Sequence, residues 1–91
     1  MRARYSAFAV GDTAYLLSSW HPSTRPAILQ PDPAIRWDRL EIIRTIAGTA
    51  DHLEGRVEFR AHYTRDGASS DLHENSRFTR HQGAWVYVDG N

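Results

Sequence analysis

The 91-residue chain contains neither lysine nor cysteine. Without lysine, it cannot form a Schiff base with a substrate or use an ammonium side chain as a general base. Without cysteine, thiol nucleophiles, disulfide bonds and thiolate zinc sites are excluded. The five histidines lack the spacing of a metal site, so we expect no metal and no other cofactor. A small domain without disulfides is typical of the cytoplasm, which is the location we expect.

An excess of charge of either sign is also missing. Eleven arginines balance eleven aspartate and glutamate residues. Nucleic-acid binding needs a basic excess that displaces counterions, and anionic membranes attract basic clusters. No apolar run approaches the length of a transmembrane helix. We therefore expect neither a nucleic acid nor a membrane as partner. A hydrophobic content of 41% is enough for one packed domain over residues 1–91.

The first twenty residues predict two short helices. The first spans Ala3–Val10 and ends at Gly11, which can adopt the left-handed conformation of a helix end. Asp12 can cap the second helix by accepting hydrogen bonds from its first turn. This helix should end at Trp20 or His21, because a proline follows and disfavours helical geometry in the residue before it.

The rest of the chain predicts a sheet. Residues 22–34 contain all four prolines and form an ordered connector. Asp66-Gly67 is a strong two-residue hairpin signal, and Gln82-Gly83 is a weaker one. Segments rich in β-branched and aromatic residues predict strands at Ile35–Ile46, Arg56–Arg65, Leu72–Arg80 and Trp85–Asp89. The expected fold is α+β, with two short N-terminal helices packed on a curved four-stranded antiparallel sheet.

A turn at Asp66-Gly67 also predicts the register of the central hairpin. It places Arg65 opposite Ala68, Tyr63 opposite Ser70, Ala61 opposite Leu72, Phe59 opposite Glu74, and Val57 opposite Ser76. A turn at Gln82-Gly83 places Trp85 opposite Arg80, Tyr87 opposite Phe78, and Asp89 opposite Ser76. Directly opposed residues share a face of the sheet.

This register separates an apolar face from a polar one. The apolar face comprises Val57, Phe59, Ala61, Tyr63, Leu72, Phe78, Trp85 and Tyr87. The polar face carries Glu58, Arg60, His62, His73 and Arg77. The two helices are the segments available to cover the apolar face. Because the polar face carries both signs of charge, we expect a monomer or a weak, salt-sensitive dimer.

Glu74 interrupts the apolar face. A carboxylate at this position either finds a partner or becomes neutral, because burial of an unpaired charge is costly. The candidate partners are Arg25, His21, Arg80 and the hydroxyl groups of Ser76 and Tyr63. Glu74 therefore either belongs to a buried ion pair that ties the connector to the sheet, or serves as an acid or base in a pocket.

The segment SSWHPSTRP, residues 18–26, is expected to be both a connector and a wall of that pocket. Its two prolines restrict the backbone where helix gives way to sheet. Trp20 should pack inward, and Arg25 should reach Glu74 with a charge that it cannot lose. His21 either ends the helix with its ring bonded to a nearby carbonyl, or shuttles protons.

Five blocks resemble the YchJ-like family of uncharacterised bacterial proteins. They are RYSAF at 4–8, SWHPSTRP at 19–26, RVEFRAHY at 56–63, LHENSRF at 72–78 and GAWVYVDG at 83–90. The resemblance covers nearly the whole chain in the same order. It implies a fold similar to nuclear transport factor 2, in which a curved antiparallel sheet wraps around helices to make a cone with a pocket.

The resemblance is to the central domain of this family alone. Longer members resemble fusions to small cysteine-rich zinc-binding motifs, like those at the end of the SecA translocation motor, and this chain has no cysteine. The family brings no established catalytic residues. The wider superfamily includes both enzymes and binding domains, so the implied fold does not decide the function.

The leading hypothesis is a domain that binds a small molecule or a peptide in an internal pocket. The expected lining is Trp20, His21, Arg25, Trp37, Phe59, Tyr63, Glu74, Ser76, Trp85 and Tyr87. One alternative is a cofactor-independent acid–base enzyme of the isomerase, dehydratase or hydrolase type, with Glu74 and His21 as candidate catalytic residues. Another alternative is a purely structural or protein-interaction module.

Overall fold

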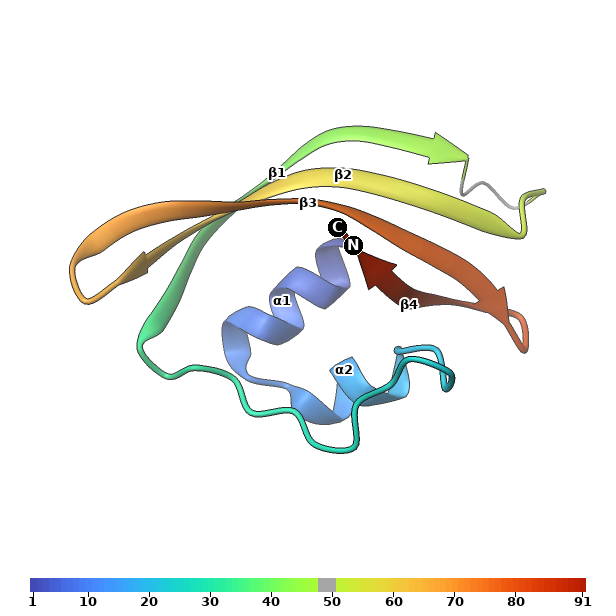
Figure 1. Ribbon diagram of the computed structural model, residues 1–91, viewed down its shortest axis with the longest axis horizontal. Coiled ribbons are helices and arrows are strands. Elements are labelled where there is room, and N and C mark those ends of the chain that lie inside the picture. The colour runs from blue at the N-terminus through green and yellow to red at the C-terminus, as the bar shows by residue number, and fades with distance from the viewer. Residues whose placement is uncertain (48–50) are drawn as a thin grey trace.

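The computed structural model describes residues 1–47 and 51–91. Within these residues, the helices are α1 (Arg2–Val10) and α2 (Thr13–Ser18), and the strands are β1 (Ile35–Ala47), β2 (Glu54–Arg65), β3 (Ala68–His81) and β4 (Ala84–Gly90). The strands form one antiparallel sheet in the order β1-β2-β3-β4. Figure 1 shows the sheet arched over both helices. The predicted α+β architecture is confirmed.

The N-terminal cap of α2 is as the sequence predicted, whereas its C-terminal end is not. Gly11 ends α1 in the left-handed conformation, with a φ of 74°, and the Asp12 side chain accepts a hydrogen bond from the backbone N–H of Tyr15 at 3.0 Å. The expected end at Trp20 or His21 is wrong, because α2 ends at Ser18. Residues 19–21 instead lie beside β4, where Trp20 and Tyr87 form a parallel bridge.

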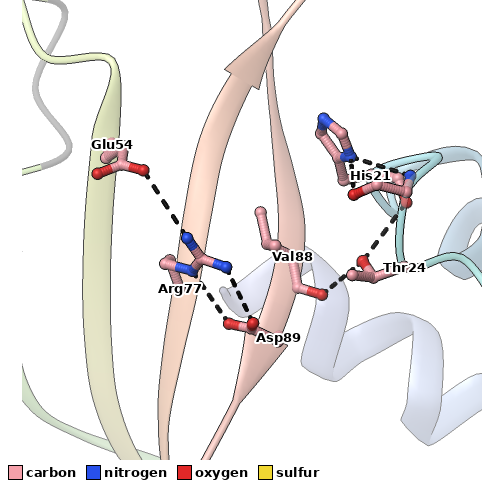
Figure 2. A network of polar contacts seen from close by, with 7 residues as sticks. His21, Thr24, Glu54, Arg77, Val88 and Asp89 are labelled. Atoms are coloured by element: carbon pink, nitrogen blue, oxygen red, sulfur yellow. Dashed lines mark hydrogen bonds and ion pairs between the residues drawn. The ribbon is translucent and has the colours of Figure 1, made fainter.

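This pairing explains why α2 is short. The backbone N–H of Tyr87 donates to the carbonyl of Ser19 at 2.9 Å, and the N–H of His21 donates to the carbonyl of Tyr87 at 2.7 Å. The Thr24 hydroxyl donates to the carbonyl of Val88 at 2.6 Å, as Figure 2 shows. The connector therefore covers the outer edge of β4, which would otherwise present unpaired backbone groups.

The central hairpin has the predicted register. All five predicted pairs, from Arg65 with Ala68 to Val57 with Ser76, are present. The turn residues Asp66 and Gly67 both have positive φ angles, 51° and 81°, which is the geometry of a two-residue hairpin turn. The alternation of side chains along β2 and β3 is therefore as the sequence predicted.

The second hairpin departs from the prediction at its far end. Trp85 lies opposite Arg80 and Tyr87 lies opposite Phe78, as expected, but a register shift follows between Arg77 and Phe78. Asp89 therefore lies opposite Arg77, and the expected pairing of Asp89 with Ser76 is wrong. Such an irregularity inserts an extra residue into one strand and bends it.

The inner face of the sheet, which faces the helices, holds much of the core. Phe59, Ala61 and Tyr87 on the sheet are buried, together with Ala7 and Leu16 on the helices. Leu72 belongs to the same face, because it pairs with Ala61, yet it is 45% exposed. It lies toward the β2–β3 hairpin, which projects beyond the helices in Figure 1.

The outer face carries ion pairs and hydrogen bonds between neighbouring strands, as expected from its predicted polarity. His73 contacts Glu58 at 2.6 Å, and Arg60 contacts Asp71 at 2.8 Å. Arg77 contacts Asp89 at 3.0 Å, as Figure 2 also shows. In the part of the chain that the structure describes, no helix is long and apolar enough to cross a membrane.

Candidate ligand-binding cavity

A cavity of about 160 Å³ lies between α1 and the inner face of the sheet. Its apolar wall comes from α1 and from the first three strands, and comprises Tyr5, Phe8, Trp37, Phe59, Ala61 and Leu72. The aromatic rings of this wall support one another. The Trp37 ring centroid lies 6.0 Å from that of Tyr5 and 5.5 Å from that of Tyr63. The cavity is therefore framed by interlocked rings rather than by loops.

Arg4 brings a buried charge to this cavity. It lies on the same face of α1 as Ala7 and Phe8, three and four residues later, and only 8% of it is exposed. Its guanidinium carbon lies 3.6 Å from the ring centroid of Tyr87 and 4.5 Å from that of Trp20. The cation is thus stacked on aromatic faces, which attract it electrostatically.

The guanidinium of Arg4 is not fully bonded. Among the residues that the structure describes, its buried Nη1 atom has no hydrogen-bond partner. Burial lowers the pKa of Arg4, whereas the neighbouring Tyr87 and Glu74 act in the opposite direction. Buried polar groups nearly always have a partner, so a buried donor without an acceptor is an unusual feature of this side chain.

Glu74 faces the same cavity, opposite Phe59 as predicted. The hydroxyl of Ser76, which is fully buried, donates to Glu74 Oε2 at 2.7 Å. Ser76 is therefore one of the partners that the sequence suggested. Tyr87 completes the polar part of the wall. Burial raises the pKa of the Tyr87 hydroxyl, and the negative charge of Glu74 raises it further.

The expected pair between Arg25 and Glu74 is wrong. Arg25 Nε and Nη2 both donate to the carbonyl of Trp20, at 3.1 and 2.9 Å. Across residues 1–47 and 51–91, these two side chains form no ion pair. The cause is local, because the connector turns at His21, whose carbonyl accepts from the N–H of Arg25. This turn directs Arg25 back onto Trp20, in the segment that lies beside β4.

Arg4 is missing from the residues predicted for the site, although the sequence contains a signal for it. Arg4, Ala7 and Phe8 are spaced so that they share one face of a helix. A charged residue in the apolar face of a short helix needs a partner or a ring to contact, just as Glu74 does on the sheet. Arg4 on α1 and Glu74 on β3, each a charged residue in an apolar face, line the same cavity.

The other predicted site residues divide into three groups. Trp37, Phe59, Glu74 and Tyr87 line the cavity. Trp20, Tyr63 and Ser76 contact lining residues without lining the cavity themselves. Trp85 lines a second cavity of about 230 Å³ with Val57 and Phe78. The lining of the first cavity includes none of residues 18–26, so SSWHPSTRP supports the wall through Trp20.

His21 lies apart from the cavity. Its Nδ1 atom accepts from the backbone N–H of Ser23 at 3.1 Å and lies 2.7 Å from the Ser23 hydroxyl. Its ring packs against that of His81 at 4.9 Å. The expected bond to a carbonyl is thus replaced by bonds within the turn. Within the described ranges, no three histidine or acidic side chains gather as a metal site.

Comparison with known proteins identifies the family to which the chain belongs. Residues 1–90 match the family model of the YchJ middle NTF2-like domain. The chain belongs to this family. It is 58% identical over 90 residues to a UPF0225 protein of Streptomyces coelicolor, covering 99% of this chain and 69% of that protein. A UPF0225 protein of Streptomyces avermitilis is also 58% identical, and this chain, 99% of which is covered, spans 61% of its length.

A solved structure resembles the YchJ-like domain over its whole length. It is a SEC-C motif containing protein from Rhodopseudomonas palustris, determined in solution, with a TM-score of 0.85 and 26% sequence identity. The match covers 100% of this chain and 73% of that protein. This likeness and the family match confirm the predicted fold, which is similar to that of nuclear transport factor 2.

The cavity of the YchJ-like domain combines two charged side chains with a mostly apolar wall. Arg4 supplies an unpaired donor, Glu74 supplies a carboxylate held by Ser76, and the remaining wall is mostly apolar. Two of the partners that the sequence suggested for Glu74 lie elsewhere. Arg25 binds the carbonyl of Trp20, and His21 belongs to the connector turn.

Proposed function

We propose that this YchJ-like domain binds a small molecule in the cavity between α1 and the inner face of the sheet. The observation that carries the proposal is Arg4 Nη1, a buried donor without a partner in the described residues, at an otherwise largely apolar cavity. An unsatisfied buried donor costs about 1–3 kcal/mol. A ligand that supplies an acceptor would remove this cost while it fills the apolar space.

The size of the cavity limits the ligand. Its volume is about 160 Å³, close to the roughly 150 Å³ of an engineered apolar cavity that binds benzene. One ring with a small substituent matches this space. A peptide could insert no more than one side chain, so the volume favours a small molecule over a peptide.

Toluene is a suitable probe of the cavity, because its ring needs no polar partner. We expect its titration to produce saturable amide shifts at Phe59, Ala61 and Tyr87 in two-dimensional NMR spectra. Ala61→Leu should abolish these shifts, because Ala61 is 3% exposed and lines the cavity. Ala68→Leu, at the exposed start of β3, is the matched control and should keep them.

Two outcomes would overturn the proposal. One is the absence of saturable shifts in the unmodified domain. The other is equal binding by Ala61→Leu, provided that its spectrum retains the dispersion of a folded protein.

We also propose that the protein resides in the cytoplasm, where small metabolites are abundant. Cells can be separated into cytoplasmic and membrane fractions, and an antibody against the domain then shows which fraction contains it.

A further inference from the structure

We infer that the ligand of this cavity is a neutral, ring-sized carboxamide, whose carbonyl accepts from Arg4 and whose N–H donates to Glu74. The inference rests on the proposed function and adds the chemical class of the ligand. It follows from the placement of an unpaired donor and a carboxylate in one small cavity.

The first step concerns the donor. Arg4 is 92% buried, since 8% of it is exposed, and its guanidinium is stacked over the rings of Tyr87, Trp20 and Phe8. A planar guanidinium held in this way presents its N–H groups in fixed directions. The guanidinium of Arg4 therefore selects a ligand with an acceptor at one position, which a carbonyl oxygen provides.

The second step concerns Glu74, which is held on the cavity side. Ser76 donates to its Oε2 atom at 2.7 Å. Its side chain also packs closely against Gly90, where an added β carbon would lie 2.6 Å from Oε1. Both contacts hold the carboxylate in place. Because carboxylates accept hydrogen bonds and do not donate them, Glu74 selects a ligand that carries an N–H or O–H group.

The third step concerns net charge. Arg4 and Glu74 carry opposite charges and line the same cavity, so the charges of these two side chains offset one another. Met1 lines it too, and burial, aided by the charge of Arg4, lowers the pKa of its terminal amino group, which favours the neutral amine there. A ligand carboxylate would add a second negative charge beside Glu74 in mostly apolar surroundings, where desolvation is costly. A neutral carboxamide matches both side chains without adding charge. The cavity should therefore prefer an amide over an acid of the same shape.

Three singly substituted benzenes separate these effects, namely toluene, benzamide and benzoate, of which the last two have the same shape. In the unmodified domain we expect benzamide to bind roughly tenfold more tightly than toluene, because its hydrogen bonds should contribute about 1.4 kcal/mol to the binding free energy. We expect benzoate to bind at least about tenfold more weakly than benzamide. NMR titration or calorimetry at pH 7 measures all three dissociation constants.

A charge change at Glu74 gives the decisive comparison. Glu74→Gln should improve benzoate relative to benzamide by roughly tenfold or more, because it leaves the Arg4 charge uncompensated. Glu54→Gln is the matched control. Its side chain is 68% exposed and contacts Arg77, outside the lining of the cavity, so the same substitution should leave the ratio unchanged.

The possible results are distinguishable. If toluene does not bind, the proposed function fails. If toluene binds as tightly as benzamide, or if benzoate binds better than benzamide to the unmodified domain, the cavity binds ligands and the carboxamide inference fails. An equal effect of Glu74→Gln and Glu54→Gln also overturns the inference. Arg4→Met should remove the advantage of benzamide over toluene, and the Glu74 comparison does not depend on the folding of that variant.

Discussion

The side chain of Glu74 packs against the backbone of Gly90. A β carbon at Gly90 would lie 2.6 Å from Glu74 Oε1, so an alanine there could be accommodated only if Glu74 moved. Gly90 pairs with Ser76, and the hydroxyl of Ser76 donates to Glu74. The end of β4 and the adjacent residue of β3 therefore hold the carboxylate at the cavity.

Gly90→Ala should displace Glu74 and break its bond to Ser76. We expect a loss of about 1 kcal/mol in the free energy of unfolding, because the lost hydrogen bond to a charged group is only partly offset by the reduced freedom of the unfolded chain. Urea unfolding measures this change. In a Glu74→Ala background the same substitution should cost nothing or stabilise slightly. An equal cost in both backgrounds would show that Glu74 is not what excludes a side chain at Gly90.

Arg4 and Glu74 should be energetically coupled, although no direct ion pair links them. Both line the same cavity, and the charge of Glu74 acts on Arg4. A double-mutant cycle with Arg4→Met and Glu74→Gln, followed by urea unfolding, should give a coupling of about 1 kcal/mol. Arg25→Ala is the control, and its effect should add to that of Glu74→Gln. Coupling at Arg25 without coupling at Arg4 would contradict the structure.

The sequence predicts those features that depend on neighbouring residues. The Asp66-Gly67 turn and the alternation along β2 and β3 are local, and together they place Glu74 opposite Phe59. They also place Glu74 on the apolar face of the sheet, although they do not identify its hydrogen-bond partner. Local signals of this kind account for the strands, the α1 terminus at Gly11 and the acid in the cavity.

The features that the sequence does not predict depend on contacts between distant residues. α2 ends at Ser18 because Ser19 and His21 bond to Tyr87, which is more than sixty residues away in the chain. The role of Arg4 likewise depends on rings from other segments, including Tyr87. No spacing near Arg4 reveals which rings these are. Pattern alone places a charge on a face, whereas tertiary packing decides what it contacts.

The outer face should support at most weak association between copies. Its charged side chains already have partners within the sheet, such as Arg60 with Asp71 and Glu58 with His73, so a second copy gains little by pairing with them. We expect sedimentation to show a monomer or a weak dimer. Any dimer should dissociate as ionic strength approaches about 1 M, where charges are screened within about 3 Å. A tight dimer that is insensitive to salt would contradict this prediction.

Asp89→Asn should change stability in a way that depends on pH. Arg77 donates to both carboxylate oxygens of Asp89, at 3.1 and 3.0 Å, across the β3–β4 pair in Figure 2. These hydrogen bonds, more than any other cause, lower the pKa of Asp89 below its usual 3.8. The unfolded chain therefore binds this proton at a higher pH than the folded domain does, so stability rises with pH through this interval.

The contribution of Asp89 is consequently complete above pH 3.8 and is lost as the pH falls through the lower pKa of the folded state. Urea unfolding of the unmodified domain and of Asp89→Asn should give free energies that differ near pH 7 and converge in acid, because the amide resembles the protonated acid. In an Arg77→Met background this pH dependence should largely disappear. Curves that stay parallel down to about pH 2 would show that the pair with Arg77 does not set the pKa of Asp89.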